Sequence, residues 1–131
     1  MTIKELEEYR ALIAEIDALN KQIESLYNTY HSPSNSEGGN SKSSSKSPVE
    51  KALTRIQSLE QVYLNRIQEL QGQAHRIEIW VSQIEDPFIR SCIRYHYLLG
   101  YSWSDTSKKM YGYTSYYNAR KAVFRFMGKE K

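Results

Sequence analysis

The sequence predicts an all-α fold, in which a long antiparallel helical hairpin of the coiled-coil type precedes a small C-terminal helix-turn-helix domain. Three observations lead to this prediction. Two long segments have apolar residues at helical spacing, a serine-rich stretch separates them, and residues 88–131 combine short helical patterns with an excess of positive charge. We therefore divide the chain of 131 residues into a hairpin, 1–84, and a helix-turn-helix domain, 85–131.

Residues 2–30 are predicted to form the first helix. Thr2 and Glu5 have the spacing of a capping box, in which each residue satisfies a free N–H group at the helix start. Apolar residues then follow a heptad pattern, and a stripe this wide requires a partner helix. We expect Asn20 to lie at a core heptad position, where a polar side chain lowers stability and fixes the register. The two core positions hold Leu6, Ile13, Asn20 and Tyr27, and Tyr9, Ile16, Ile23 and Tyr30.

A serine-rich stretch and a second long helix follow. Residues 31–48 contain eight serines and few apolar residues, so we predict a disordered loop that is long enough for the chain to reverse. Residues 48–84 are predicted to form the second helix, with Ser47 and Glu50 as another capping box. Two helices with such wide stripes keep apolar surface after they pair. We therefore expect self-association, most simply a homodimer built as a four-helix bundle.

The net charge of +3 is distributed unevenly along the chain. Residues 1–31 have three basic and six acidic residues, residues 32–87 have six and seven, and residues 88–131 have nine and two. The three segments therefore have net charges of −3, −1 and +7. A basic excess confined to the C-terminal third is typical of a surface that binds a polyanion.

Three short helices are predicted in the basic third, over residues 87–99, 103–111 and 115–127. A short helix, a three-residue turn that contains glycine and a longer basic helix occur in the order of a helix-turn-helix motif. The boundaries are marked by Asp86, Pro87 and Gly100 for the first helix, Ser102 and Asp105 for the second, and Gly112 and Thr114 for the third. The inner stripe of the last helix is expected at Tyr116, Ala119, Val123 and Phe126.

The last helix also has an outer polar stripe, which predicts contacts with double-stranded DNA. A helix fits the major groove, where asparagine pairs with adenine and lysine or arginine pairs with guanine or contacts phosphate. The predicted stripe consists of Thr114, Asn118, Lys121 and Arg125, with Ser115, Tyr117 and Arg120 beside it. Contacts with phosphates are expected from Lys108, Lys109, Arg94 and Lys129.

The passages RYHYLLGYSW and MYGYTSYYNARKA resemble a known family. The region around them is similar to the helix-turn-helix of sigma-factor region 4, and more closely to the ArpU/RinA-type regulators of late transcription in phages of Gram-positive bacteria. The resemblance covers roughly residues 48–127 and implies a phage-encoded transcription regulator. The chain departs from the family at Thr106 and Ser107, where a hydrophobic residue and alanine are usual. Two hydroxyls that face a small core lower its stability unless they form hydrogen bonds.

The sequence offers no assembled catalytic site, so we expect a protein without enzymatic activity and without a cofactor. Cys92 and His96 lie four residues apart on one helix but have no second pair of ligands, so we expect a buried thiol, a buried or partly exposed imidazole and no metal site. A single cysteine favours a reducing cytoplasm. An acidic start without an apolar stretch argues against a secretion signal, and no segment predicts a membrane span.

Two other functions are compatible with the sequence. In the first, the long helices dock on RNA polymerase or a sigma factor, and the C-terminal domain does not bind DNA itself. In the second, the chain is the small subunit of a phage DNA-packaging machine, which also combines a helix-turn-helix with helical oligomerisation. Light scattering distinguishes the second from a dimer, because a packaging subunit forms ring-sized oligomers.

Overall fold

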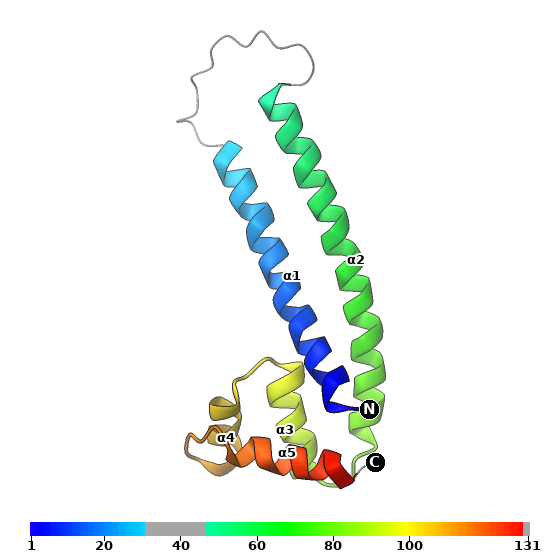
Figure 1. Cartoon of the computed structure of the whole chain (residues 1–131), viewed down its shortest axis with the longest axis vertical. Helices are drawn as coiled ribbons and strands as arrows, with labels where there is room; N and C mark the ends of the chain where they lie inside the picture. Colours follow the sequence, from blue (N-terminus) through cyan, green and yellow to red (C-terminus); the bar gives the residue numbers. More distant parts are fainter. Residues whose placement is uncertain (31–46, 130–131) are drawn as a thin grey trace. The chain divides into compact units, whose positions relative to one another are not determined.

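The computed structural model describes residues 1–30 and 47–129, and every regular element in these residues is helical (Figure 1). This confirms the all-α prediction. The predicted disordered loop, 31–48, lies outside the described residues except for its last two positions. The elements are α1 (Ile3–Tyr30), α2 (Pro48–Ser82), α3 (Pro87–Ile93), the π-helix η1 (Arg94–Leu98), α4 (Trp103–Tyr111) and α5 (Asn118–Lys129).

Contacts divide the chain into two compact units. We call residues 14–68 the hairpin unit, and residues 1–13 together with 69–131 the C-terminal unit. The C-terminal unit is thus larger than the segment 85–131 that the sequence suggested, because the start of α1 and the end of α2 pack with the short helices. No described helix is both long enough and apolar enough to cross a membrane.

Side chains cap α1, α2 and α3 where the sequence predicted. The N–H of Glu50 donates to Ser47 Oγ at 3.1 Å, and the N–H of Ser47 donates back to Glu50 Oε1 at 3.2 Å, so this capping box is complete. At the start of α1, the N–H of Glu5 donates to Thr2 Oγ1. At the start of α3, the N–H of Phe88 donates to Asp86 Oδ1 at 2.9 Å. Capping of this kind typically contributes about 1 kcal/mol for each helix.

The hairpin unit has a thin core between antiparallel helix segments. Its buried side chains are Ile16, Ile23, Ala52 and Ile56. The segments run antiparallel, since Glu15 pairs with Arg66 near one end and Tyr27 donates to Glu60 near the other. The prediction for Asn20 is wrong, because Asn20 is exposed and its amide donates to Glu24 on the same helix.

The C-terminal unit has a much larger core that draws on all of its helices. Leu6 and Tyr9 of α1 and Ile77 and Val81 of α2 belong to the same buried cluster as the short helices. The short helices contribute Ile89, Cys92, Ile93, Tyr97, Trp103, Ala119, Val123 and Met127. Six described helical elements therefore share one core, and the short helices do not form a separate body.

The predicted helix 87–99 changes its winding near its middle. It is α-helical up to Ile93 and π-helical from Arg94 to Leu98, where the N–H of Leu99 donates to the carbonyl of Arg94, five residues earlier. Gly100 then adopts a φ of +82°, which suits a residue without Cβ, and ends the helix as expected. The side chain of Arg10 donates to the carbonyls of His96 and Gly100, so it satisfies acceptors that the helix end leaves free.

The connection between α4 and α5 is longer than the predicted three-residue turn. Gly112 has a φ of +90° and closes α4, but α5 begins only at Asn118, so residues 112–117 separate the two helices. Ser115, and not Thr114, caps α5, since its Oγ accepts the N–H of Asn118 at 3.2 Å. The expected inner stripe is therefore wrong at Tyr116, which is 50% exposed, and Phe126 is half-buried. The buried stripe consists of Ala119, Val123 and Met127.

Candidate nucleic-acid interface

Unpaired cations gather on α4 and α5. Lys121 and Arg125 are exposed and lie four residues apart, so they share one face of α5. Lys108 and Lys109 are exposed at the end of α4. Within the described part of the chain, none of these four side chains has an ion-pair partner. Their charge is available to an anionic ligand.

Two of the predicted contact residues are engaged within the protein instead. Arg94 forms an ion pair with Glu78 of α2, with 2.7 Å between Nη1 and Oε1. The guanidinium of Arg120 lies over the ring of Phe124, 4.4 Å from its centre, and 5.8 Å from the centre of Tyr116. These two arginines tie helices and rings together, and they have less freedom to meet DNA than the lysines do. The side chain of Lys129 lies outside the described residues.

The residues before α5 form a tyrosine-rich turn. Thr114 and Tyr117 are exposed, and Ser115 is half-buried because it caps the helix. These three predicted contact residues therefore precede the first turn of α5 and do not lie on its side. Asn118 is the first residue of the helix, and the hydroxyl of Tyr113 accepts a hydrogen bond from its amide nitrogen at 2.9 Å. The sequence prediction missed Tyr113, since nothing in its spacing places it beside Asn118.

A buried hydrogen bond joins α4 to α5. Ser107 is fully buried, and its Oγ accepts the backbone N–H of Ala119 at 3.1 Å. This contact explains why a hydroxyl is tolerated in the core: it satisfies a free N–H group in the first turn of α5. The neighbouring hydroxyl of Thr106 is equally buried and has no hydrogen-bond partner among the residues that the structure describes. The hydroxyl of Ser107 therefore has a structural role that the hydroxyl of Thr106 does not share in this part of the chain.

Cys92 and His96 are both buried, as expected. Burial and the nearby Asp86 raise the pKa of the Cys92 thiol to about 11, so it has little thiolate character at neutral pH. His96 stacks on Trp103 with 3.6 Å between ring centres, and its Nδ1 donates to the carbonyl of Tyr101 at 2.7 Å. Burial and the charge of Arg10 lower the pKa of His96 to about 4, so the imidazole is neutral. Among the described residues, no cluster of histidine, cysteine and acidic side chains has the composition of a metal site.

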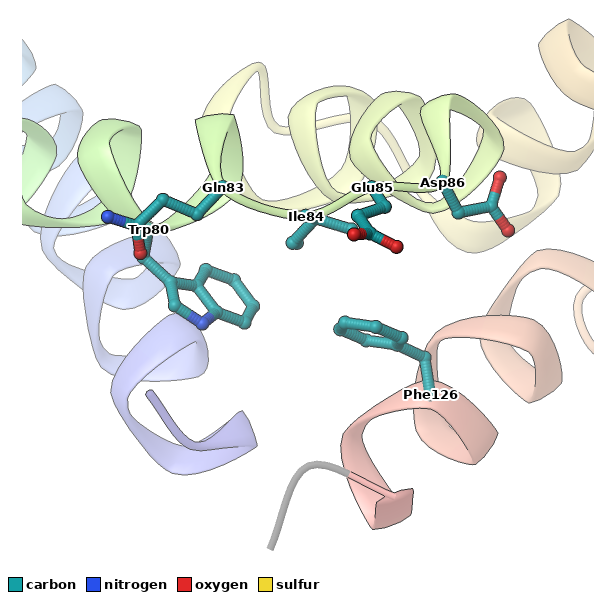
Figure 2. A pocket seen from close by; sticks show the side chains of 6 residues that line it. All are labelled: Trp80, Gln83, Ile84, Glu85, Asp86 and Phe126. Carbon is teal, nitrogen blue, oxygen red and sulfur yellow. The ribbon is translucent and has the colours of Figure 1, made fainter.

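A hollow of about 560 Å³ lies elsewhere in the C-terminal unit, between the end of α2 and α5 (Figure 2). Figure 2 shows the rings of Trp80 and Phe126 on facing sides of this hollow, with Glu85 on its edge. Asp86 also lines it, although one of its oxygens caps α3. Carboxylates at the edge repel phosphate, so this hollow is not part of a DNA-binding surface. Aromatic rings beside a carboxylate suit a cationic side chain.

Comparison with known proteins identifies no relative of this chain. No family model, no curated protein and no solved structure matches this chain.

Proposed function

We propose that this protein is a DNA-binding transcription regulator, phage-encoded and sequence-specific, that inserts α5 into the major groove. The observation that supports the proposal best is the set of exposed cations on α4 and α5 that have no ion-pair partner among the residues described by the structure. Unpaired cations give a protein surface a positive electrostatic potential. The regularly spaced phosphates of a DNA duplex are attracted to such a surface. From Phe88 to Lys129 the sequence contains one acidic residue, Asp105, so little negative charge opposes this potential.

Seven of the predicted contact residues have a role in this proposal. Asn118 contacts a base edge, and Lys121 and Arg125 contact guanine or phosphates farther along α5. Lys108 and Lys109 contact phosphates and set the orientation without reading the sequence. Ser115 and Tyr117 lie next to the positive end of the α5 dipole, where a phosphate also binds favourably.

The hairpin unit is proposed to form a homodimer. Three large apolar residues of α2 remain exposed. Their exposed fractions are 56% for Val49, 43% for Leu53 and 55% for Leu64. They are separated by four and eleven residues, so they share one side of α2. A second copy of the hairpin unit buries such a stripe and produces a four-helix bundle. Two-fold symmetry then places two copies of α5 on half-sites that are one or more turns of DNA apart.

The test is the affinity of the purified protein for duplex DNA at low salt, measured by fluorescence anisotropy. We expect Lys121→Ala with Arg125→Ala to weaken binding by at least about tenfold. The matched control is Lys51→Ala with Arg55→Ala, because these cations are also exposed, unpaired in the described residues and four residues apart. Binding that is undetectable, or that both double variants weaken equally, contradicts the proposal.

A second candidate function is docking on a protein partner such as RNA polymerase. The hollow of Trp80, Phe126 and Glu85 favours it, because aromatic rings and a carboxylate bind an arginine or lysine side chain. A pull-down separates the two functions. Docking predicts that the Lys121→Ala, Arg125→Ala variant still retains polymerase and that Glu85→Lys, at an exposed position, does not. If both variants retain polymerase, or if neither does, the hollow no longer supports docking on a protein partner.

A further inference from the structure

Within the outer stripe of α5, Asn118 is the residue that hydrogen bonds fix most firmly in place. Its backbone N–H donates to Ser115 Oγ at 3.2 Å, and its side-chain nitrogen donates to the hydroxyl of Tyr113 at 2.9 Å. Its backbone carbonyl also accepts a long hydrogen bond from Tyr111, at 3.5 Å. Lys121 and Arg125 have no such contacts in the described residues. The side chain of Asn118 is therefore oriented before any ligand arrives.

Tyr113 is itself held by a chain of aromatic contacts. Its ring lies 6.0 Å from the ring of Tyr111, and Tyr111 meets Phe88 of α3 edge to face at 5.3 Å. Phe88 packs against the buried core. Although Tyr113 is 56% exposed, its hydroxyl is thus connected to the core through two further rings. The position of the Asn118 amide depends on this chain.

The hydrogen-bonding capacity of the Asn118 amide limits what it can bind. A side-chain amide has two N–H donors and one carbonyl acceptor. Tyr113 uses one N–H, so one N–H and the carbonyl oxygen remain. Adenine presents one acceptor, N7, and one donor, the N6 amino group, in the major groove. The remaining groups of Asn118 match this pair, and with a bidentate contact both N–H groups and the carbonyl oxygen of the amide are engaged.

We propose that Tyr113 is a specificity-determining residue, which positions Asn118 to read one adenine. Tyr113 need not touch the base. It fixes the rotamer of Asn118, and the contact with adenine then requires less ordering of the side chain. This inference rests on the proposed function, since it assigns a base to the DNA-binding helix.

The test uses the base preference of the full-length protein. Selection from random duplexes defines the preferred site, and Asn118→Ala identifies the base pair whose preference depends on Asn118. We expect Tyr113→Phe to reduce the preference for adenine at that pair by roughly 2- to 10-fold, with the other positions unchanged. Tyr116→Phe is the control, because Tyr116 is similarly exposed, at 50%, is not one of the predicted contact residues, and its hydroxyl has no hydrogen-bond partner in the described residues.

A second measurement needs no DNA. Relaxation of the ¹⁵N-labelled side-chain amide of Asn118 is expected to show greater mobility in Tyr113→Phe than in Tyr116→Phe. A wild-type protein that binds no duplex contradicts the proposed function and this inference together. A protein that binds DNA, but whose adenine preference is unchanged in Tyr113→Phe or is insensitive to Asn118→Ala, overturns the inference alone.

Discussion

The two compact units of this chain differ in how completely they bury their apolar side chains. The C-terminal unit shares one core among α1, α2 and the short helices, and it contains both tryptophans. Among its described residues, the hairpin unit buries four side chains and leaves Val49, Leu53 and Leu64 exposed. The C-terminal unit also contains the four exposed cations of α4 and α5, for which the described residues offer no ion-pair partner.

This difference indicates separate tasks for the two units. A unit with a complete core folds on its own contacts and holds surface groups in fixed positions, as a binding site requires. A pair of helices with a thin core and an exposed apolar stripe gains stability when another copy covers it. The proposed function accordingly gives DNA binding to the C-terminal unit and self-association to the hairpin unit, as an assignment to be tested. The following predictions test that assignment, from the largest expected effect to the smallest.

The first prediction concerns the exposed stripe of the hairpin unit. Leu53→Glu with Leu64→Glu places two charges where we propose that a second copy packs. Burial of one leucine contributes about 1.5–3 kcal/mol, so the dimer dissociation constant should rise by at least about 100-fold. Sedimentation velocity over a range of concentrations measures it.

The control for this prediction is Ile79→Glu with Leu99→Glu in the C-terminal unit. These residues are exposed to a similar degree, 49% and 62%, and the substitutions add the same charge. The dimer dissociation constant of this double variant should stay near that of the wild type. A wild-type chain that is monomeric at high concentration rules out the assignment for the hairpin unit.

The second prediction concerns the core of the C-terminal unit. Ile93 is fully buried, and Ile93→Ala should lower the free energy of unfolding by about 2–5 kcal/mol. Urea denaturation followed by tryptophan fluorescence measures this unit alone, because Trp80 and Trp103 both lie in it. Leu99→Ala, at an exposed position, should change the free energy by less than about 0.5 kcal/mol. Equal effects of the two substitutions would mean that the core is not packed as described.

The third prediction concerns pH. The pKa of His96 is about 4 in the folded protein and near 6.5 in the unfolded chain, so the unfolded chain binds more protons between these values. Stability is therefore lost as the pH falls from about 6.5 to about 4, and a difference of this size corresponds to roughly 3 kcal/mol. His96→Asn, which keeps a donor for the carbonyl of Tyr101, should flatten the dependence of the unfolding free energy on pH.

The control for the pH experiment is His75→Asn, since His75 is exposed on α2. This variant should keep the wild-type slope between pH 4 and 6.5. A slope that persists in His96→Asn assigns the acid sensitivity to other groups.

The fourth prediction separates two adjacent buried hydroxyls. Ser107→Ala leaves the N–H of Ala119 buried without a partner and should cost about 1–3 kcal/mol of stability. Thr106→Val removes a hydroxyl that has no partner, so it should be neutral or stabilising. Thermal unfolding of the two variants, followed by tryptophan fluorescence, measures both. Destabilisation by Thr106→Val that equals that of Ser107→Ala would contradict the hydrogen-bond assignment.

Local signals in the sequence were sufficient to predict the helices. Capping residues such as Ser47 and Asp86, together with Gly100 and Gly112, act through contacts within a few residues, so their positions along the chain indicate where helices begin and end. The prediction failed where contacts between residues distant in the sequence determine which side chains are buried. Asn20 occupies a core heptad position in the sequence, yet the packing of the hairpin unit leaves it exposed.

The candidate site shows the same limit. Lys121 and Arg125 are exposed as the outer stripe predicted, because their side of α5 follows from helical periodicity. The engagement of Arg94 by Glu78 depends on how α3, η1 and α2 pack, and no local pattern reports it. No local pattern predicts the hydrogen bond between Ser107 and Ala119 or the one between Tyr113 and Asn118 either. Both depend on the path of the turn before α5.

The salt dependence of DNA binding tests the assignment of the C-terminal unit most directly. Each lysine that contacts a phosphate contributes about one to the slope of log affinity against log salt concentration. We predict that Lys108→Ala with Lys109→Ala reduces the magnitude of this slope by about two, whereas Lys51→Ala with Arg55→Ala in the hairpin unit leaves it unchanged. An unchanged slope in the Lys108, Lys109 variant, or an equal reduction in both variants, would contradict the account.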